Sequence, residues 1–310
     1  MNIVVTGGAG FIGAHLCRAL AARGDRVTVY DDLTAGFAVS LSGSGASLVV
    51  GSTSDRDLLT ETVAPADAIV HLASRPSVPR AVEDPAAAHE VNVTGALNVL
   101  EAARHCGAHV VLMGSAAVYG EHEGPSREDL PARPLSPYGA SELAAEAYTL
   151  AYGHSFGVPA LPFRLFNVYG SLQTAGRAHS AVVPAFLDAA LRNRPLQIHG
   201  DGRQVRDFVH VSTVVAAVLD ALDRRVTSSV PVNLALGAGR TLLELVSLLE
   251  NLLGRPLEVV HTHPRRAEPR VSLADPSRFR ALFPSVPSVP LEHGLAETLA
   301  WFRSEETLPV

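Results

Sequence analysis

Lysine is absent from this sequence. All 25 side chains in the combined lysine and arginine count are arginines, against 31 aspartates and glutamates in 310 residues. The absence excludes every mechanism that needs a lysine Schiff base, a lysine general base or the lysine of a phosphate-binding P-loop. A coding bias toward arginine explains most of these positions, because alanine, proline and glycine are abundant as well.

Cysteines, basic tracts and long apolar runs are also scarce. Cys17 and Cys106 lie within apolar helical patterns, so we expect small core residues and neither a disulfide framework nor a metal site. A formal net charge of −6 without a basic tract argues against nucleic acid or an anionic membrane as the main partner. The chain begins directly with a strand-like run, and no apolar stretch approaches ~18 residues. We therefore expect a cytoplasmic enzyme.

Short apolar runs typical of buried parallel strands alternate with helix-length amphipathic segments. These runs are Ile3–Thr6, Val27–Tyr30, Leu48–Val50, Ala68–Leu72, Val110–Met113 and Ala160–Phe163. The alternation predicts an α/β fold with a Rossmann-type, doubly wound parallel sheet that carries helices on both faces.

Beyond residue 165 this rhythm loosens. We expect a loop-rich segment from Val168 to Gly202, strands at Asp207–Val211 and Pro231–Ala235, and helices at Val214–Asp223 and Thr241–Leu253. The predicted sheet domain comprises residues 1–165 and about 205–235. Residues 166–204 and 236–310 are predicted to form a smaller α/β substrate-binding cap over the carboxyl edge of the strands.

A glycine motif follows the first predicted strand and opens a helix at Ala14–Ala22. Gly7 permits a tight turn, Gly10 lets the backbone approach a pyrophosphate, and Gly13 lets helix and strand pack closely. The second strand ends in Asp31 and Asp32, where an acidic side chain binds the adenosine ribose and repels a 2′-phosphate. This context favours NAD over NADP. The alternative is that the two aspartates are solvated turn residues without a role in binding.

Further motifs occur in order along nearly the whole chain. They are His-Leu-Ala-Ser at 71–74, Ser-Val-Pro-Arg at 77–80, Asn-Val-Thr-Gly at 92–95, Gly-Ser-Ala-Ala-Val-Tyr-Gly at 114–120, Ser-Pro-Tyr-Gly-Ala-Ser at 136–141, Arg-Leu-Phe-Asn-Val-Tyr-Gly at 164–170 and Gly-Asp-Gly-Arg-Gln-Val-Arg-Asp-Phe at 200–208. Together they resemble the extended short-chain dehydrogenase/reductase family, in its NAD-dependent nucleotide-sugar epimerase and dehydratase branch.

The resemblance implies two sets of binding residues. For NAD it implies Gly7, Gly10, Phe11, Ile12, Gly13, Asp31, Asp32, Ser52, Thr53, Leu72, Ala73, Ser74, Asn92, Tyr138 and Glu142. For a UDP-sugar it implies Ser77, Arg80, Ser115, Asn167, Val182, Gln197, His199, Arg206, Arg265 and Ser272, with Arg266 as an alternative to Arg265. Ser52 stands where the family often has an aspartate that reads the adenine amino group, and it replaces only part of that contact.

The implied catalytic residues are Ser115, Tyr138 and, at the family's lysine position, Glu142. Replacing a cation by an anion ~6 Å away reverses an interaction of ~3 kcal/mol at an effective dielectric constant of ~20, which makes Tyr138 a poor base. Three readings remain open: a protonated or solvated Glu142 with slow turnover, a Glu142 that acts as a base, or a protein that binds without turnover. An exposed glutamate without a role is the fourth.

The substrate positions favour one reaction of this branch. Ser272 is small where family members restricted to plain hexoses carry a tyrosine, so the resemblance favours an N-acetylhexosamine, while the motif at 77–80 also fits UDP-uronic acids. Ala116 and Ala117 replace the acid and base of a 4,6-dehydratase. We therefore predict an NAD-dependent 4-epimerase acting on a UDP-hexose through a 4-keto intermediate. The alternatives are an impaired binding paralogue, an atypical dehydratase and an oxidoreductase on the same substrates.

Two helices carry the predicted oligomer contact. The segments Ala86–Cys106 and Tyr138–Tyr152 resemble the pair through which this family dimerises as a four-helix bundle. Their apolar faces are also explained by packing on the sheet.

Overall fold

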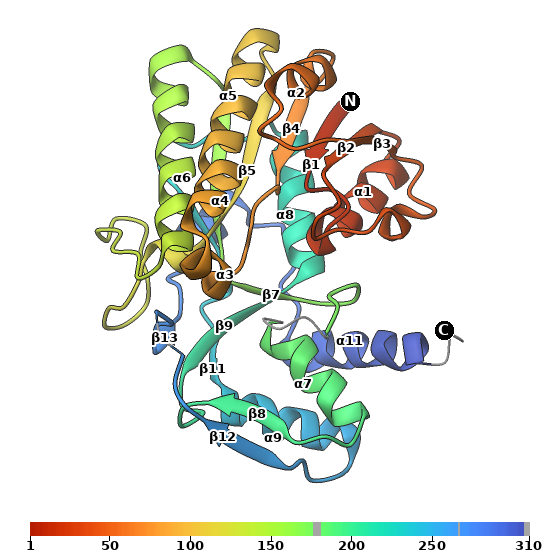
Figure 1. Ribbon diagram of the computed structural model, residues 1–310, viewed down its shortest axis with the longest axis vertical. Coiled ribbons are helices and arrows are strands. Elements are labelled where there is room, and N and C mark those ends of the chain that lie inside the picture. Colours follow the sequence, from red (N-terminus) through yellow and green to blue (C-terminus); the bar gives the residue numbers. More distant parts are fainter. Residues whose placement is uncertain (176–180, 266, 307–310) are drawn as a thin grey trace.

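A seven-stranded parallel sheet forms the centre of the molecule (Figure 1). The computed structural model describes residues 1–175, 181–265 and 267–306. The strands are β1 (Asn2–Thr6), β2 (Arg26–Asp31), β3 (Ser47–Val50), β4 (Ala68–His71), β5 (His109–Ser115), β6 (Ala160–Leu165) and β10 (Val232–Leu234). Their order is β10-β6-β5-β4-β1-β2-β3, so the direction of winding reverses between β1 and β4. The predicted doubly wound fold is confirmed, and ligands of such sheets bind at this reversal.

Helices cover both faces of the sheet. The helices α2 (Arg56–Val63), α5 (Gly95–Cys106) and α6 (Pro137–Phe156) lie on one face, and α1 (Phe11–Ala22) and α8 (Val211–Asp223) lie on the other (Figure 1). Alternate residues of each strand supply the two cores. In β1, for example, Ile3 and Val5 pack toward α1 and α8, whereas Val4 packs toward α2 and α5.

The smaller part of the molecule has its own core below the sheet in Figure 1. It contains α7 (Val182–Leu191), α9 (Leu242–Leu253), α11 (Leu291–Glu306) and the parallel pair β8 (Leu196–His199) and β12 (Val259–Thr262). The segment at 168–202 is therefore not loop-rich throughout, because it contains α7 and β8. Pro184 lies in the first turn of α7, where the missing N–H of a proline costs nothing.

The strand expected at 207–211 does not extend the large sheet. It is β9 (Val205–His210), which pairs with β7 (Asn167–Tyr169), β11 (Gly239–Thr241) and β13 (Val271–Ser272) in a separate four-stranded sheet. The strand at 231–235 does join the large sheet, as β10 next to β6. In the same region, α10 (Ser277–Leu282) places Phe279 against the large core. The predicted division into two domains remains a prediction.

The helix expected at 86–106 is interrupted. It consists of α4 (Pro85–His89), the π-helical turn η2 (Glu90–Thr94) and α5, after the short helix α3 (Val78–Glu83). Two 3-10 turns, η1 (Ala38–Leu41) and η3 (Ala116–Val118), complete the elements. Cys17 is fully buried in α1, as expected, and both cysteines are free. None of the helices in the described ranges combines the length and apolar character that crossing a bilayer requires.

Candidate active site

A cavity of about 1660 Å³ runs along the carboxyl edge of the large sheet and continues into the smaller part. Predicted residues that line it are Gly7, Gly10, Phe11, Ile12, Gly13, Asp31, Asp32, Thr53, Leu72, Ala73, Ser74, Ser77, Ser115, Tyr138, Asn167, Val182, Gln197, His199, Arg206 and Arg265. Five other predicted residues lie outside its wall: Ser52, Arg80, Asn92, Glu142 and Ser272. Arg266 falls outside the described residues.

The glycine loop has the geometry that a pyrophosphate requires. Gly7 has φ +70°, and a Cβ there would lie 2.7 Å from the Ala73 nitrogen. A Cβ on Gly13 would lie 2.5 Å from the Gly8 Cα, so the helix could not approach the loop as it does. No side chain caps α1 at Gly10, and the residues that begin the helix, from Gly10 to Gly13, line the cavity. The residues present therefore fit a dinucleotide.

The two aspartates after β2 differ in their surroundings. Asp31 is buried, and its carboxylate accepts hydrogen bonds from the backbone N–H groups of Ala9 at 2.9 Å and Leu33 at 2.8 Å. It thus ties the glycine loop to β2, while burial raises the pKa of its carboxyl. Asp32 is exposed and accepts from the Thr34 hydroxyl at 2.7 Å. Both line the cavity, where they would face a ribose.

The adenine end of the cavity contains Thr53 in its wall and not Ser52. The Ser52 hydroxyl accepts from the Ser54 N–H at 3.2 Å, and the Ser52 carbonyl accepts from the Tyr30 hydroxyl at 2.9 Å. Thr53 is buried against Gly95, and its hydroxyl has no hydrogen-bond partner among the described residues. Thr53 therefore contributes to the wall at this end, with its hydroxyl oxygen itself buried.

Asn92 lies behind the wall, in the π-helical turn η2. Its side-chain oxygen accepts from the Arg75 N–H at 2.7 Å, and its amide nitrogen donates to the Ser141 hydroxyl at 2.9 Å. Ser141 in turn donates to the Tyr138 carbonyl at 2.8 Å. Through these hydrogen bonds Asn92 links the loop after β4 to the start of α6.

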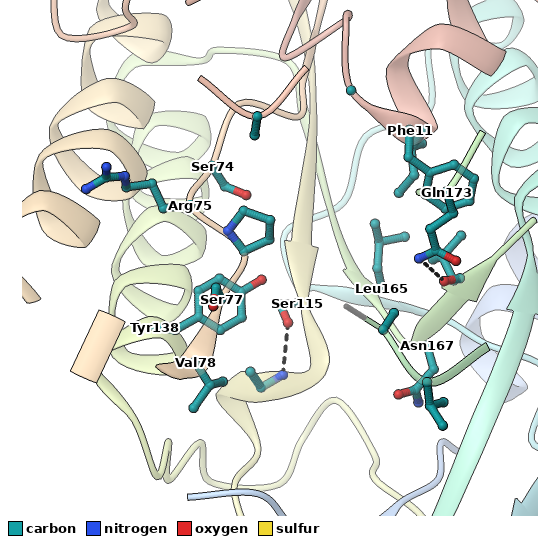
Figure 2. A pocket seen from close by; sticks show the side chains of 18 of the residues that line it. Phe11, Ser74, Arg75, Ser77, Val78, Ser115, Tyr138, Leu165, Asn167 and Gln173 are labelled. Atoms are coloured by element: carbon teal, nitrogen blue, oxygen red, sulfur yellow. Dashed lines mark hydrogen bonds between the residues drawn. The ribbon is translucent and has the colours of Figure 1, made fainter. Parts of the chain in front are cut away.

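Ser115 and Tyr138 lie on one side of the cavity, with Asn167 on the other (Figure 2). Ser115 ends β5 and accepts from the Ala117 N–H at 3.1 Å. Tyr138 stands in the first turn of α6, which begins here because Ser136 caps the helix and Pro137 occupies its first position. Burial and the Glu142 carboxyl raise the pKa of Tyr138, and the Ser115 hydroxyl opposes part of this shift.

Glu142 follows Tyr138 by one turn and points behind the cavity wall. Its side chain is 5% exposed, and a Cβ placed on Gly114 would lie 3.9 Å from its Oε2. Gly114 itself lines the cavity next to Ser115. Burial, together with the Glu146 carboxylate, raises the pKa of Glu142 from 4.5 to about 8. Because Glu142 is buried, an exposed glutamate without a role is ruled out, and the raised pKa favours the neutral carboxyl at pH 7.

The next turn of α6 carries a second buried carboxylate that is paired. Both oxygens of Glu146 accept hydrogen bonds from Arg164 of β6, at 2.7 Å from Nε and 2.6 Å from Nη2. Both side chains are about 4% exposed. The fork geometry uses the guanidinium for Glu146 and leaves none of these donors for Glu142.

The far arm of the cavity carries cationic and polar groups. Arg206 is buried on β9, and its Nη2 donates to Glu268 Oε1 at 3.1 Å. His199 Nδ1 lies 2.8 Å from the Thr262 hydroxyl. Arg265 is exposed, so it can reach a ligand from the open side. These groups suit a diphosphate and a polar sugar or base.

Several lining residues were not singled out from the sequence. They include Arg75, Gln173, Arg194 and Glu268. Glu268 stands in the same short motif as Arg265, three residues after this predicted phosphate-binding arginine. No sequence pattern marks the other three, because loop geometry brings them to the cavity.

A family model matches residues 3–235, which is most of the chain, and its description is the NAD dependent epimerase/dehydratase family. The chain belongs to this family. As a member, it is an NAD-dependent enzyme of the extended short-chain dehydrogenase/reductase type. The predicted family and cofactor are thereby confirmed.

Known relatives match over their full length. A UDP-glucose 4-epimerase of Mycolicibacterium smegmatis is 35% identical, covering 98% of this chain and 99% of the relative. A UDP-glucose 4-epimerase of Thermotoga maritima, solved with UDP-glucose, has a TM-score of 0.93 at 32% identity, covering 99% of this chain and 100% of that one. The Thermus thermophilus enzyme, solved with NAD, has a TM-score of 0.90 at 33% identity, with coverages of 98% and 99%.

Proposed function

We propose that the chain is a UDP-hexose 4-epimerase that works through a 4-keto sugar. The observation that carries the proposal is the position of Ser115 and Tyr138 between the glycine loop and the arm that carries Arg206, within one cavity. Two hydroxyl groups at this position can form hydrogen bonds with a sugar hydroxyl while the sugar carbon lies next to the cofactor. Bound NAD supplies hydride transfer and is regenerated in the cycle.

The chain's own residues hold and protonate the sugar. The hydroxyls of Tyr138 and Ser115 exchange the proton of the C4 hydroxyl. Arg206 and Arg265 bind the diphosphate, while Gln197 and His199 line the arm that takes the rest of the nucleotide sugar. Freed to rotate, a 4-keto sugar would accept hydride on its other face, which inverts C4.

The wall near the sugar favours epimerisation over 4,6-dehydration. Ala116 and Ala117 begin η3 directly after Ser115, and neither can supply the acid or the base that elimination needs. Ser272 pairs with Arg206 across β13 and β9 but lies outside the cavity wall, so its small side chain does not bear on the size of the sugar. The motif at 77–80, whose Ser77 lines the cavity, supports a UDP-N-acetylhexosamine or a UDP-uronic acid as the substrate.

A product analysis tests the proposal. The protein is incubated separately with UDP-N-acetylglucosamine, UDP-glucose and UDP-glucuronate, and the configuration at C4 is followed by NMR. We expect inversion with at least one of them, and a loss of about 100-fold or more in kcat for Tyr138→Phe. Tyr148→Phe, on the exposed side of α6, is the matched control and should keep full activity.

A binding protein without turnover is the second candidate, and the raised pKa of Tyr138 favours it. A phenol that stays protonated at neutral pH is a weak base. Tight binding of NAD and a UDP-sugar, with unchanged C4 configuration at high enzyme concentration, would select this candidate and refute the first.

The pair of helices α5 and α6 supports a homodimer. Tyr148 and Phe156 of α6 are exposed, and Arg104 of α5 stacks on the Phe156 ring with its Cζ 4.0 Å from the centroid. Two copies of this face would form a four-helix bundle. Analytical ultracentrifugation should show a dimer, and Tyr148→Glu with Phe156→Glu should yield a monomer.

A further inference from the structure

Glu142 is a buried carboxyl that the proposed epimerase cycle does not use. It lies between two residues of its own helix, Tyr138 on the cavity side and Glu146 on the sheet side. Gly114 lines the cavity without a side chain, and a Cβ placed on it would lie 3.9 Å from the Glu142 Oε2, so the carboxyl lies close to the cavity wall. A charge at this position therefore acts on whatever occupies the cavity next to Ser115.

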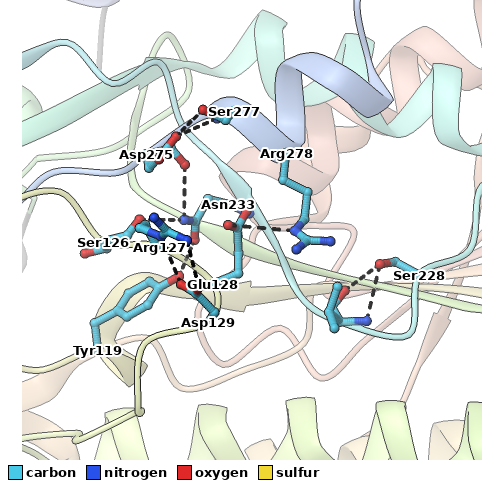
Figure 3. A network of polar contacts seen from close by, with 11 residues as sticks. Tyr119, Ser126, Arg127, Glu128, Asp129, Ser228, Asn233, Asp275, Ser277 and Arg278 are labelled. Atoms are coloured by element: carbon cyan, nitrogen blue, oxygen red, sulfur yellow. Dashed lines mark hydrogen bonds and ion pairs between the residues drawn. The ribbon is translucent and has the colours of Figure 1, made fainter.

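The buried cation Arg164 pairs with Glu146 and stacks on Tyr119, and its Nη1 has no hydrogen-bond partner among the described residues. Arg164 binds Glu146 through two donors, and its Cζ lies 4.5 Å from the centroid of the Tyr119 ring. Tyr119 is itself fixed, because its hydroxyl donates to Asn233 Oδ1 at 2.6 Å within the network of Figure 3. Asn233 also donates to the Ser126 carbonyl at 2.9 Å. Arg164 therefore cannot turn toward Glu142 without breaking both contacts.

Other charged groups on neighbouring elements are turned away or lie far along the helices. On α5, Glu101 accepts from the Tyr152 hydroxyl, near the other end of α6. The charged residues of α3, α4 and η2 are exposed: Arg80, Glu83, His89 and Glu90. Among the described residues, the charge that acts on Glu142 is the carboxylate of Glu146, and it opposes ionisation.

A positively charged ring in the cavity would reverse this balance. The nicotinamide ring is positively charged in NAD⁺ and uncharged in NADH. We propose that Glu142 gives the site a preference for NAD⁺ over NADH, by releasing its proton to solvent when the charged ring binds beside Ser115 and Tyr138. The inference rests on the proposed NAD site, with the nicotinamide ring beside Ser115 and Tyr138, and not on epimerase turnover.

The sign of the pH dependence follows from the linkage between proton and cofactor. NAD⁺ stabilises the ionised carboxyl and therefore lowers the pKa of Glu142, which is about 8 without it. NAD⁺ binding then tightens as the pH rises through this range, while NADH binding does not. A pKa lowered by one gives about a tenfold change in affinity between the two pH limits.

Competition between NAD⁺ and NADH measures this preference directly. The fluorescence of bound NADH is followed while NAD⁺ displaces it, at pH 6.5 and at pH 9.5. We expect the affinity ratio of NAD⁺ to NADH to rise about tenfold between these values in the unmodified protein. Glu142→Gln, which keeps the shape but cannot ionise, should show a constant ratio. The exposed Glu61→Gln on α2 should behave like the unmodified protein.

Calorimetry supplies a second readout that needs no variant. Titrations in two buffers of different ionisation enthalpy count the protons released, and we expect release near pH 8 with NAD⁺ and none with NADH. A constant affinity ratio together with no proton release would overturn the inference while leaving the epimerase proposal intact. Failure of NAD⁺ to bind at all would overturn both.

Discussion

Two glutamates one helical turn apart on α6 have opposite electrostatic surroundings. Glu142 and Glu146 are 5% and 4% exposed, so burial alone does not distinguish them. Glu146 accepts two hydrogen bonds from Arg164, whereas Glu142 accepts none from the described residues. Whether a buried carboxyl is charged therefore depends on whether a cation pairs with it, and not on how deeply it is buried. The same difference controls Tyr138, because a neutral Glu142 repels its phenolate less than an ionised one.

Removing the partner of Glu146 should have the largest effect. Arg164→Met leaves a buried carboxylate without its cation, next to a second carboxyl, and should lower the free energy of unfolding by about 4 kcal/mol. Urea denaturation at pH 7 measures the loss. Arg164→Met combined with Glu146→Leu should recover most of it, and a single Arg164→Met as stable as the unmodified protein would show that the pair contributes no stability.

The pH dependence of stability tests whether Glu142 is protonated in the folded protein. The folded pKa of Glu142 is raised from 4.5 to about 8, so the folded state binds a proton that the unfolded chain has lost. Stability is therefore lost as the pH rises through this interval. Between pH 6 and pH 9 the unmodified protein should lose about 3 kcal/mol relative to Glu142→Gln. Parallel curves for the two proteins would contradict a buried, protonated Glu142.

Restoring a cation at position 142 should change activity. In Glu142→Lys the ammonium can pair with Glu146 and lower the pKa of Tyr138, so we expect kcat to rise about tenfold at pH 7. The measurement is the rate of C4 inversion. If Glu142→Lys abolished turnover instead, the glutamate would have an active part in the reaction.

His71 is a third buried titratable group, and its hydrogen-bond partner, the Thr6 hydroxyl, carries no charge. His71 is 4% exposed, its Nδ1 lies 2.6 Å from the Thr6 hydroxyl, and burial lowers its pKa to about 4. Thr6→Val should cost about 1 kcal/mol in the free energy of unfolding, measured at pH 7.

Because the folded pKa of His71 is depressed, the protein should also lose stability as the pH falls from 6.5 toward 4. A pH-independent stability across this interval would refute a neutral, buried His71.

Much of the sheet and of the cofactor loop could be predicted from the sequence. Buried parallel strands appear in the sequence as continuous apolar runs. The glycine motif after the first strand is predictable because a dinucleotide-binding turn requires glycines at fixed positions. The helix α7 and the strand β8 could not be predicted in this way. β8 pairs with β12, about 60 residues later, and α7 contains a proline that resembles a helix breaker.

Some residues of the site could likewise be predicted from the sequence, and others could not. Residues next to strand ends, such as Ser115 and Asp31, follow from the topology, because all parallel strands end at one edge. Asn92 and Ser52 are different, since local turns direct their side chains away from the cavity. The protonation of Glu142 depends on which carboxylate Arg164 binds, and no pattern within α6 contains that information.

The charge of Glu142 at neutral pH can be observed directly. Infrared spectroscopy with ¹³C-labelled glutamate distinguishes a protonated carboxyl from a carboxylate, and the label separates glutamates from aspartates. At pH 7 we expect a protonated glutamic acid band that is absent in Glu142→Gln and fades as the pH rises through about 8. A spectrum at pH 7 with only ionised glutamates would contradict the assignment of Glu142 as a neutral acid.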